Sequence, residues 1–172
     1  MIMNTHIIEL PITSSKLEEL KHGDKILLSG VIYTARDKAH KRIVESLNRG
    51  LELGIPWKDT AIFYCGPSPV RPGKICGAIG PTTSTRMDSY TPILLEAGLK
   101  IIIGKGEIGD DVSRALKQHG AIYLTCPGGV SAALARCIVS CETFLWGNLG
   151  AEAVYRMTVK DLPCFVSSLP SE

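Results

Sequence analysis

Short apolar runs rich in β-branched residues alternate along the chain with longer stretches of helical periodicity. The short runs predict strands, because β-branched and aromatic residues fit a pleated sheet and turn-forming residues bound each run. Seven strands are predicted, over residues 7–12, 25–33, 61–65, 100–103, 121–125, 154–159 and 164–168.

Helices are predicted where apolar residues recur three and four positions apart. The first covers about residues 35–53, in which Ala39, Ile43 and Leu47 share one face, and Gly54 ends it. The others are predicted over about residues 88–96, 111–118 and 130–139, and a short helical turn is predicted over residues 14–20.

The middle of the chain repeats a unit of strand, glycine-rich loop and helix. Such units favour parallel strands joined by right-handed crossovers. The strands near both ends lack intervening helices, and we expect them to form antiparallel pairs. A length of 172 residues is typical of one domain. The sequence therefore predicts a single α/β domain over residues 1–172, with a parallel central sheet and additional antiparallel strands.

Composition and charge exclude several classes of protein. Hydrophobic residues make up 45% of the chain and charged residues 21%, as in globular proteins. A net charge of +2 gives no overall basic field for nucleic acid. Apolar runs such as residues 101–103 are far too short to span a bilayer, and the first residues do not resemble a signal peptide. We expect a cytoplasmic protein that binds neither nucleic acid nor membrane.

The six cysteines are spaced too widely to indicate a metal centre. None forms a C-x-x-C pair, and the closest two, Cys137 and Cys141, fall in or beside a predicted helix. Structural zinc and iron–sulfur sites normally show tighter clusters of thiolates. We expect reduced thiols packed as small buried residues, and no metal ligands in this chain.

Residues 80–88 read Gly-Pro-Thr-Thr-Ser-Thr-Arg-Met-Asp and place four hydroxyl residues between a turn and a helix start. Free N–H groups at a helix N-terminus attract anions. Hydroxyls add donors, and the planar fork of Arg86 fits a carboxylate. The alternative is a helix cap with spare threonines, but capping needs only one such residue. We favour an anion-binding loop.

Two further cations stand at strand-to-helix junctions. Lys105 lies between Gly104 and Gly106 after a strand of isoleucines, where it can point at a ligand. The spacing is not that of a P-loop, and a surface turn with a solvated lysine is the alternative. Arg36 opens a helix, where a cation opposes the helix dipole. That placement indicates a role other than helix stability.

His40 lies four residues after Arg36, on the same predicted helix face. Imidazole titrates near neutral pH, which makes His40 a candidate acid–base group; an exposed or capping histidine is the alternative. Gly128 and Gly129 offer backbone donors at a fourth junction, although close packing explains them equally well.

Arg36, Arg86 and Lys105 all follow strands and precede helices. In an α/β sheet such junctions gather at one edge, and three converging cations would suit two carboxylates or one phosphate. The sequence contains no G-x-S-x-G, no H-E-x-x-H and no dinucleotide fingerprint. We therefore expect half of an active site, with the other half supplied by a second polypeptide.

Several motifs in fixed order resemble the β subunit of class I, iron–sulfur-dependent fumarate hydratase, a family that includes L(+)-tartrate dehydratase β subunits. The likeness covers nearly the whole chain, and the order is more specific than any single motif. The motifs lie within residues 28–30, 34–37, 39–42, 64–67, 80–84, 86–88 and 104–106.

The resemblance implies a hydro-lyase that interconverts fumarate and L-malate, with a swivelling β/β/α three-layer fold. It also implies a [4Fe–4S] cluster bound by a partner α subunit rather than by this chain, in an α2β2 assembly. Carried over by motif, the substrate-binding residues would be Arg36, Thr83, Arg86 and Lys105, and the catalytic residues would be Thr82 and His40.

Thr82 would sit at the reacting carbon and take part in proton transfer. A threonine hydroxyl is a poor base alone, so Lys105 or an acidic residue of the partner would have to assist it. Three other functions stay open. One is an L(+)-tartrate dehydratase β subunit with the same chemistry. Another is a non-catalytic module that binds a phosphorylated ligand at residues 104–106. The third is a structural assembly subunit, in which substitution of Thr82 would leave the complex fully active.

Overall fold

The computed structural model describes residues 3–170, which form a mixed α/β fold around one seven-stranded sheet. The strands are β1 (Thr5–Glu9), β2 (Lys25–Thr34), β3 (Ala61–Phe63), β4 (Ile101–Gly104), β5 (Ile122–Thr125), β6 (Ile138–Leu145) and β7 (Val154–Ser168). The α-helices are α1 (Ser14–Glu18), α2 (Asp37–Asn48), α3 (Thr91–Glu96), α4 (Asp110–His119) and α5 (Ser131–Ala135), and short 3-10 turns cover Trp57–Asp59, Ser84–Met87 and Gly147–Glu152.

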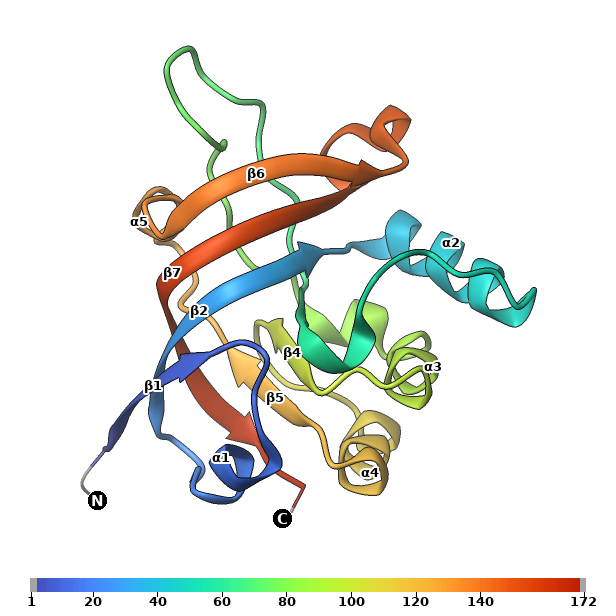
Figure 1. The fold of residues 1–172 in the computed structure, drawn as a ribbon, viewed down its shortest axis with the longest axis vertical. Coiled ribbons are helices and arrows are strands. Elements are labelled where there is room, and N and C mark those ends of the chain that lie inside the picture. Colours follow the sequence, from blue (N-terminus) through green and yellow to red (C-terminus); the bar gives the residue numbers. More distant parts are fainter. Residues whose placement is uncertain (1–2, 171–172) are drawn as a thin grey trace.

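The sheet closes on itself into a five-stranded, barrel-like arrangement (Figure 1). Strands β2, β3, β4 and β5 run parallel, and β7 lies antiparallel to both β5 and β2, which completes the ring. β1 extends the sheet beside β2, and β6 extends it beside β7. Because the four parallel strands point the same way, the loops that follow them emerge at one end of the barrel.

Alternating side chains divide the core into two layers. Ile101 and Ile103 of β4 belong to a cluster drawn from every strand of the ring, which fills the barrel interior. Ile102, between them, belongs to a second cluster that lies between the sheet and the helices. Both faces of β4 are buried, which explains why this strand reads as a continuous apolar run.

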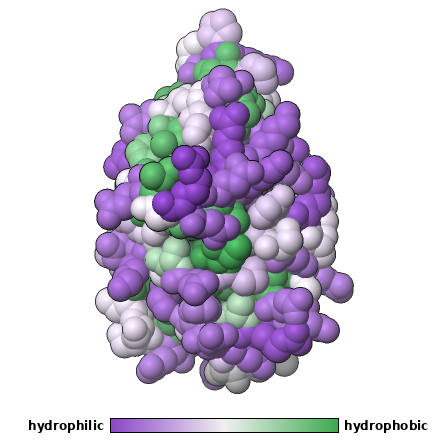
Figure 2. All heavy atoms as spheres, turned by 90° about the vertical axis from the view of Figure 1, so that its right-hand side faces the viewer, coloured by the Kyte–Doolittle hydropathy of each residue, from purple (hydrophilic) through white to green (hydrophobic). Residues whose placement is uncertain are grey.

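Helices α2, α3 and α4 cover one side of the barrel (Figure 1). Each contributes buried side chains to the outer core layer, including Ile43, Leu94 and Leu116. Figure 2 shows this side of the molecule, where hydrophilic residues predominate and apolar residues appear between them. The helices therefore bury one face against the sheet and turn the other to solvent, as amphipathic helices do.

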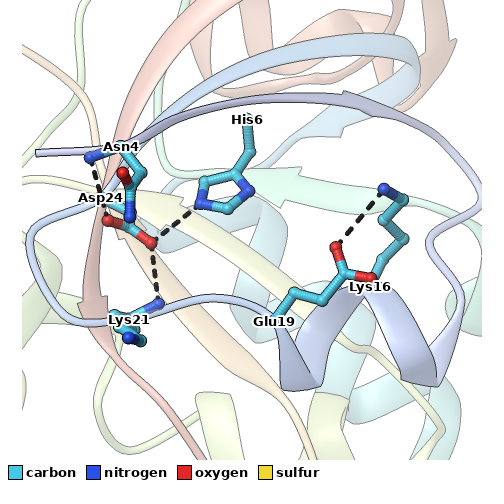
Figure 3. A network of polar contacts seen from close by, with 6 residues as sticks. All are labelled: Asn4, His6, Lys16, Glu19, Lys21 and Asp24. Atoms are coloured by element: carbon cyan, nitrogen blue, oxygen red, sulfur yellow. Dashed lines mark hydrogen bonds and ion pairs between the residues drawn. The ribbon is translucent and has the colours of Figure 1, made fainter.

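The buried carboxylate of Asp24 anchors β1 at the end of the sheet where β2 begins (Figure 3). Asp24 accepts hydrogen bonds from the backbone N–H groups of Asn4 and Lys21, at 3.3 and 3.0 Å, and from His6 Nε2 at 2.9 Å. Burial alone would raise the pKa of Asp24, but these hydrogen bonds lower it overall. The network ties β1 to the turn that precedes β2.

The N-terminal pairing differs from the prediction. β1 runs parallel to β2, from Thr5 opposite Lys25 to Glu9 opposite Ser29, so the expected antiparallel pair is wrong here. The short helix α1 lies between the two strands in the chain and returns it for a parallel pairing. Antiparallel pairing is confirmed at the other end, where β7 lies against β2, β5 and β6.

The C-terminal region contains two corrections. Residues 154–168 form one strand rather than two, and the bend that separates the two predicted runs lies at Asp161, whose φ is 53°. The predicted helix over residues 130–139 is confirmed only in its first half, because α5 ends at Ala135 and β6 begins at Ile138. The alanine run favours a helix, but pairing with β7 extends the next residues into a strand.

The remaining helices agree with the pattern, although α1, α2 and α3 are shorter than predicted. α2 ends at Asn48 rather than near residue 53, because Gly50 adopts a positive φ of 69° and turns the chain. The mixed α/β class, with parallel central strands and additional antiparallel ones, is confirmed, while the three-layer swivelling arrangement stays a prediction. Within residues 3–170, no helix combines the length and apolar character needed to cross a membrane.

Candidate functional site

Four loops meet beyond the carboxyl ends of the parallel strands. Arg36 follows β2, Gly66 lies just after β3, Lys105 follows β4, and Gly128 lies beyond β5. The segment of residues 80–88 runs across these loops. Two isolated backbone bridges hold it there, Cys65 with Pro81 and Thr83 with Lys105.

The hydroxyl-rich loop is held by its backbone. The N–H of Thr82 donates to the Tyr64 carbonyl at 2.7 Å, and the N–H of Ser84 donates to the Lys105 carbonyl at 3.0 Å. These two N–H groups are therefore not free for an anion. Thr82 is half-buried and Thr83 is exposed, which leaves the side-chain hydroxyls rather than these two N–H groups as the available donors.

Ser84 is a structural residue within this loop. Its Oγ accepts the Lys105 N–H at 3.0 Å and lies 2.8 Å from the Tyr123 hydroxyl, which in turn donates to the Gly106 carbonyl at 2.9 Å. Burial raises the pKa of Tyr123 to about 12, so its hydroxyl keeps its proton. The network fixes the backbone of Lys105 relative to the hydroxyl-rich loop.

Arg86 reaches back to the start of α2. Its Nε lies 3.1 Å from Asp37 Oδ1, in an ion pair whose side chains are 50% and 31% exposed respectively. The second oxygen of Asp37 is buried without a partner. Engaging only Nε leaves the two terminal nitrogens of the guanidinium available for a ligand.

Arg36 occupies the cap position of α2, with extended backbone and no side-chain capping bond. Its Nε is buried and has no hydrogen-bond partner. A Cβ added at Gly66 would lie 2.8 Å from Arg36 Cδ and 2.3 Å from the Ala151 carbonyl oxygen. Only glycine leaves room for the arginine side chain to pass between these segments.

His40 is fully buried one turn into α2. Its Nδ1 donates to the Arg36 carbonyl at 2.9 Å, which leaves Nε2 as an acceptor with no partner. The ring packs edge-on against Tyr64, with centroids 4.9 Å apart, and is tilted against Tyr90. Burial lowers the pKa of His40 to about 4. The imidazole is therefore neutral at neutral pH, unlike the ordinary histidine assumed from sequence.

Asp88 closes the hydroxyl-rich loop. Its Oδ2 accepts the Gly109 N–H at 2.9 Å, whereas its Oδ1 is buried without a partner. Burial raises the pKa of Asp88, and the nearby Asp111 carboxylate adds to the effect. The loop thus ends on a carboxylate that is tied to the segment following Lys105.

The unpartnered buried atoms gather at this end of the fold. Among residues 3–170, the buried side-chain nitrogen and oxygen atoms without a hydrogen-bond partner are Arg36 Nε, Asp37 Oδ2, His40 Nε2 and Asp88 Oδ1. Each such atom carries a desolvation cost unless a ligand, water or partner group meets it. Three of the four belong to one turn at the start of α2. Their gathering there indicates a binding site.

The structure places the predicted site residues in two groups at the same end of the barrel. Thr83 bridges to Lys105, whose exposed side chain passes near Gly128. Arg86 contacts Asp37, the neighbour of Arg36. One segment, residues 80–88, links the two groups, because it carries both Thr83 and Arg86. His40 lies in the buried layer behind Arg36, and Thr82 follows directly on the bridge at Pro81.

The sequence indicated the cationic residues of the site but not the carboxylates and hydroxyls that fix their surroundings. Asp37 directly follows Arg36, and Asp88 lies two residues after Arg86. Both carboxylates therefore lie inside motifs that the sequence had already indicated. Tyr123 carried no comparable signal, because it sits in a buried strand whose pattern indicates packing alone. Only the fold brings its hydroxyl to Ser84.

The described residues do not fit a cluster or metal site. Among them, no group of three or more histidine, cysteine or acidic side chains is close enough together to hold a metal ion. An iron–sulfur cluster is normally held by several cysteine thiolates. The candidate site at the end of the barrel therefore contains cationic and hydroxyl groups without a ligand set for a cluster among the described residues.

Comparison with known proteins gives a consistent set of relatives. The sequence model of a family described as "Fumarase C-terminus" matches residues 3–168. The chain is 37% identical over 153 residues to fumarate hydratase 2 of Leishmania major and 36% identical over 154 residues to the aerobic class I fumarate hydratase of Escherichia coli K12. Each alignment covers 88% of this chain but only 27% and 28% of those relatives, so the chain spans just over a quarter of their length.

A shorter relative matches along most of its length. The chain is 32% identical over 165 residues to a Methanocaldococcus jannaschii protein that carries the provisional name L(+)-tartrate dehydratase subunit beta. That alignment covers 93% of this chain and 85% of the relative. The described fold therefore corresponds to a unit that occurs both within longer proteins and as a separate chain.

Proposed function

The chain belongs to the fumarase C-terminus family, and from this premise we propose that it is the β subunit of a hydro-lyase that interconverts fumarate and L-malate. The single observation that carries the proposal is the gathering of cationic and hydroxyl side chains beyond the parallel strands. A fumarate or malate ion presents two carboxylates, and guanidinium and ammonium groups on adjacent loops match that charge.

In this proposal Arg36, Arg86 and Lys105 hold the substrate carboxylates, and Thr83 adds a hydroxyl donor. The unpartnered Nε of Arg36 supports its part, because a substrate oxygen would satisfy it. Arg86 has Asp37 on Nε alone, which orients the guanidinium and leaves its outer edge for a carboxylate. A hydrogen bond between charged groups contributes about 1.5–3 kcal/mol.

We propose that Thr82 takes part in proton transfer at the reacting carbon. The bond from its N–H to the Tyr64 carbonyl fixes its backbone, so the hydroxyl is held on the loop that also carries Arg86. A threonine hydroxyl needs a neighbouring group to activate it. Lys105, one bridge away through Thr83, or an acidic residue of the partner would assist.

The proposed acid–base role of His40 is limited to one nitrogen of its ring. Its ring is neutral and Nδ1 is engaged, so only Nε2 could accept a proton or hydrogen bond. A neutral imidazole beside Arg36 does not repel that guanidinium. We propose that His40 chiefly holds the Arg36 carbonyl and so sets the direction of the cation.

The resident cofactor of the proposed enzyme is a [4Fe–4S] cluster bound by a partner α subunit. The lack of a ligand group among the described residues supports that assignment, and the shorter relative carries the name of a β subunit. We further propose an α2β2 assembly and a swivelling β/β/α three-layer fold for this unit. The cluster would supply the open iron for hydro-lyase chemistry, while this chain binds and orients the dicarboxylate.

The test is substitution of Arg86 in the complex with its partner. Arg86→Ala is expected to lower kcat/KM for fumarate hydration at least tenfold, which corresponds to about 1.4 kcal/mol of lost transition-state stabilisation. Arg114→Ala is the matched control, because Arg114 is an exposed arginine paired with Asp111 on α4. An Arg86 variant as active as the Arg114 variant would remove Arg86 from the site.

The second candidate is an L(+)-tartrate dehydratase β subunit, favoured by the relative that matches over 85% of its own length. Malate and tartrate differ by one hydroxyl, so the same cations would serve both. A side-by-side assay of the complex with L-malate and L-tartrate separates the two functions. If phosphate raised the melting temperature of the chain more than either dicarboxylate did, a non-catalytic anion-binding module would replace both.

A further inference from the structure

We propose that Cys76 and Cys141 form a modification site, at which a small disulfide of the glutathione class converts the two thiols into a reversible intramolecular disulfide. The site is separate from the proposed substrate-binding groups. It joins the long loop of residues 66–80 to the outermost strand β6, and the proposal does not depend on which reaction the enzyme catalyses.

Two distant segments bring the thiols together. Cys76 lies on the loop that leads into residues 80–88, and Cys141 lies on β6, paired with Met157 of β7. Both side chains line one surface depression, and each strongly influences the pKa of the other. Figure 1 shows this loop projecting beyond β6. The loop and β6 therefore bring the two cysteines to one interface between loop and sheet.

A surface hollow gives small molecules a way in. Cys76 and Cys141 both line a depression of about 200 Å³, whose other walls come from the 66–80 loop, Ala151 and Tyr155. Cys141 is half-buried rather than enclosed. A disulfide reagent can therefore approach its sulfur from solvent.

The pair has the asymmetry that thiol–disulfide exchange needs. The interaction with Cys76 lowers the pKa of Cys141, whereas the same interaction raises the pKa of Cys76. Burial raises the pKa of both Cys65 and Cys137. The thiolate is the nucleophile in exchange, so Cys141 is expected to react first and Cys76 second.

The exchange balances in two steps. The Cys141 thiolate attacks one sulfur of the small disulfide, forms a mixed disulfide and releases one small thiolate. The Cys76 thiol then loses its proton to water and attacks Cys141 Sγ, which forms the protein disulfide and releases the second small thiolate. The two protein thiols are oxidised and one small disulfide is reduced to two thiols.

Such a bond would restrain the loop that precedes the proposed catalytic segment. The loop is already closed at its base, where Ser68 N–H donates to the Ala78 carbonyl and Ser68 Oγ accepts the Ala78 N–H, both at 2.9 Å. Cys76 lies inside that closure, four residues before Gly80. A cross-link to β6 would fix the loop against the sheet.

The test is peptide mapping of the full chain after incubation with oxidised glutathione at neutral pH, followed by alkylation of the remaining free thiols. The expected product links the peptides that contain Cys76 and Cys141, and dithiothreitol reverses it. The variant Cys76→Ser should stop at a glutathione adduct on Cys141. The variant Cys141→Ser should leave Cys76 free.

Cys137→Ser is the control, because Cys137 is also half-buried and lies near the start of β6. It should form the Cys76–Cys141 bond at the wild-type rate. Free thiols at both Cys76 and Cys141 after incubation would overturn the proposal, as would a disulfide between other cysteines or an adduct that forms on Cys137 as fast as on Cys141.

Discussion

The ion pair between Arg86 and Asp37 orients the guanidinium that we propose binds a substrate carboxylate. Asp37 engages Nε and leaves the outer edge of the guanidinium free. Asp37→Asn should lower kcat/KM of the complex about tenfold, mainly through a higher KM, because Arg86 loses its preferred direction.

The same substitution should barely change stability. The Arg86 side chain is 50% exposed and that of Asp37 is 31% exposed, and ion pairs that are open to solvent contribute about 0–1 kcal/mol. Urea unfolding of the chain measures this, and Asp111→Asn, which breaks the exposed pair on α4, is the control. A large loss of stability with unchanged KM would make Asp37 a structural residue instead.

His40 predicts a specific dependence of stability on pH. Its pKa falls from 6.5 to about 4 on folding because the ring is buried. Between these pH values the unfolded chain binds more protons than the folded one. The contribution of His40 to the free energy of unfolding is therefore complete above about pH 6.5 and is lost as the pH falls towards 4. The full effect is on the order of 3 kcal/mol.

Urea unfolding at pH 5 and pH 7 measures that contribution. The wild-type chain should be less stable at pH 5, and His40→Gln should flatten the difference, because glutamine does not titrate. If the variant kept the wild-type difference, another group would be responsible for it.

At the level of elements, β4 and the hydroxyl-rich loop are packed too closely for any side chain at Gly104. An added Cβ would lie 1.9 Å from Ser84 Oγ and 3.0 Å from the Tyr123 hydroxyl. Gly104→Ala should cost about 1–3 kcal/mol, as overpacking does, and should displace Lys105, whose N–H bonds to Ser84.

Gly128→Ala is the matched control for Gly104→Ala. A Cβ there would meet only Lys105 Cδ at 3.6 Å, an ordinary contact. Its free energy of unfolding should stay within about 0.5 kcal/mol of the wild type. Equal losses in the two variants would show that the contact of Gly104 with Ser84 is not the cause.

The elements that the sequence predicted well are those whose pattern is local. Helix α4 begins and ends near the predicted residues. Its end is set by Gly120, which takes a left-handed conformation after the helix. The failures lie at β6 and β7. The alanine run before β6 favours a helix, and the bend at Asp161 resembles a turn between strands. Pairing of β6 with β7 decides the first case, and pairing of β2 with β7 on both sides of Asp161 decides the second.

At the scale of the whole molecule, we propose that the binding groups lie at one end of the closed sheet and that a second polypeptide supplies the rest of the site. The isolated chain should therefore hydrate no fumarate and bind no iron–sulfur cluster, and activity should appear when the partner is added. Absorbance of fumarate in the ultraviolet follows the reaction. Measurable hydration by the pure, metal-free chain would contradict the two-subunit proposal.

The sequence by itself determined the alternation of strands and helices, the cations at three junctions and the family, because each rests on local pattern or motif order. The tertiary structure decided how the sheet closes, that β1 is parallel and that residues 138–145 form a strand, since these depend on pairing between distant residues. It also decided that His40 is neutral, that Arg86 rests on Asp37 and that Cys76 meets Cys141. Burial and contact set those properties, and neither is encoded at any single position.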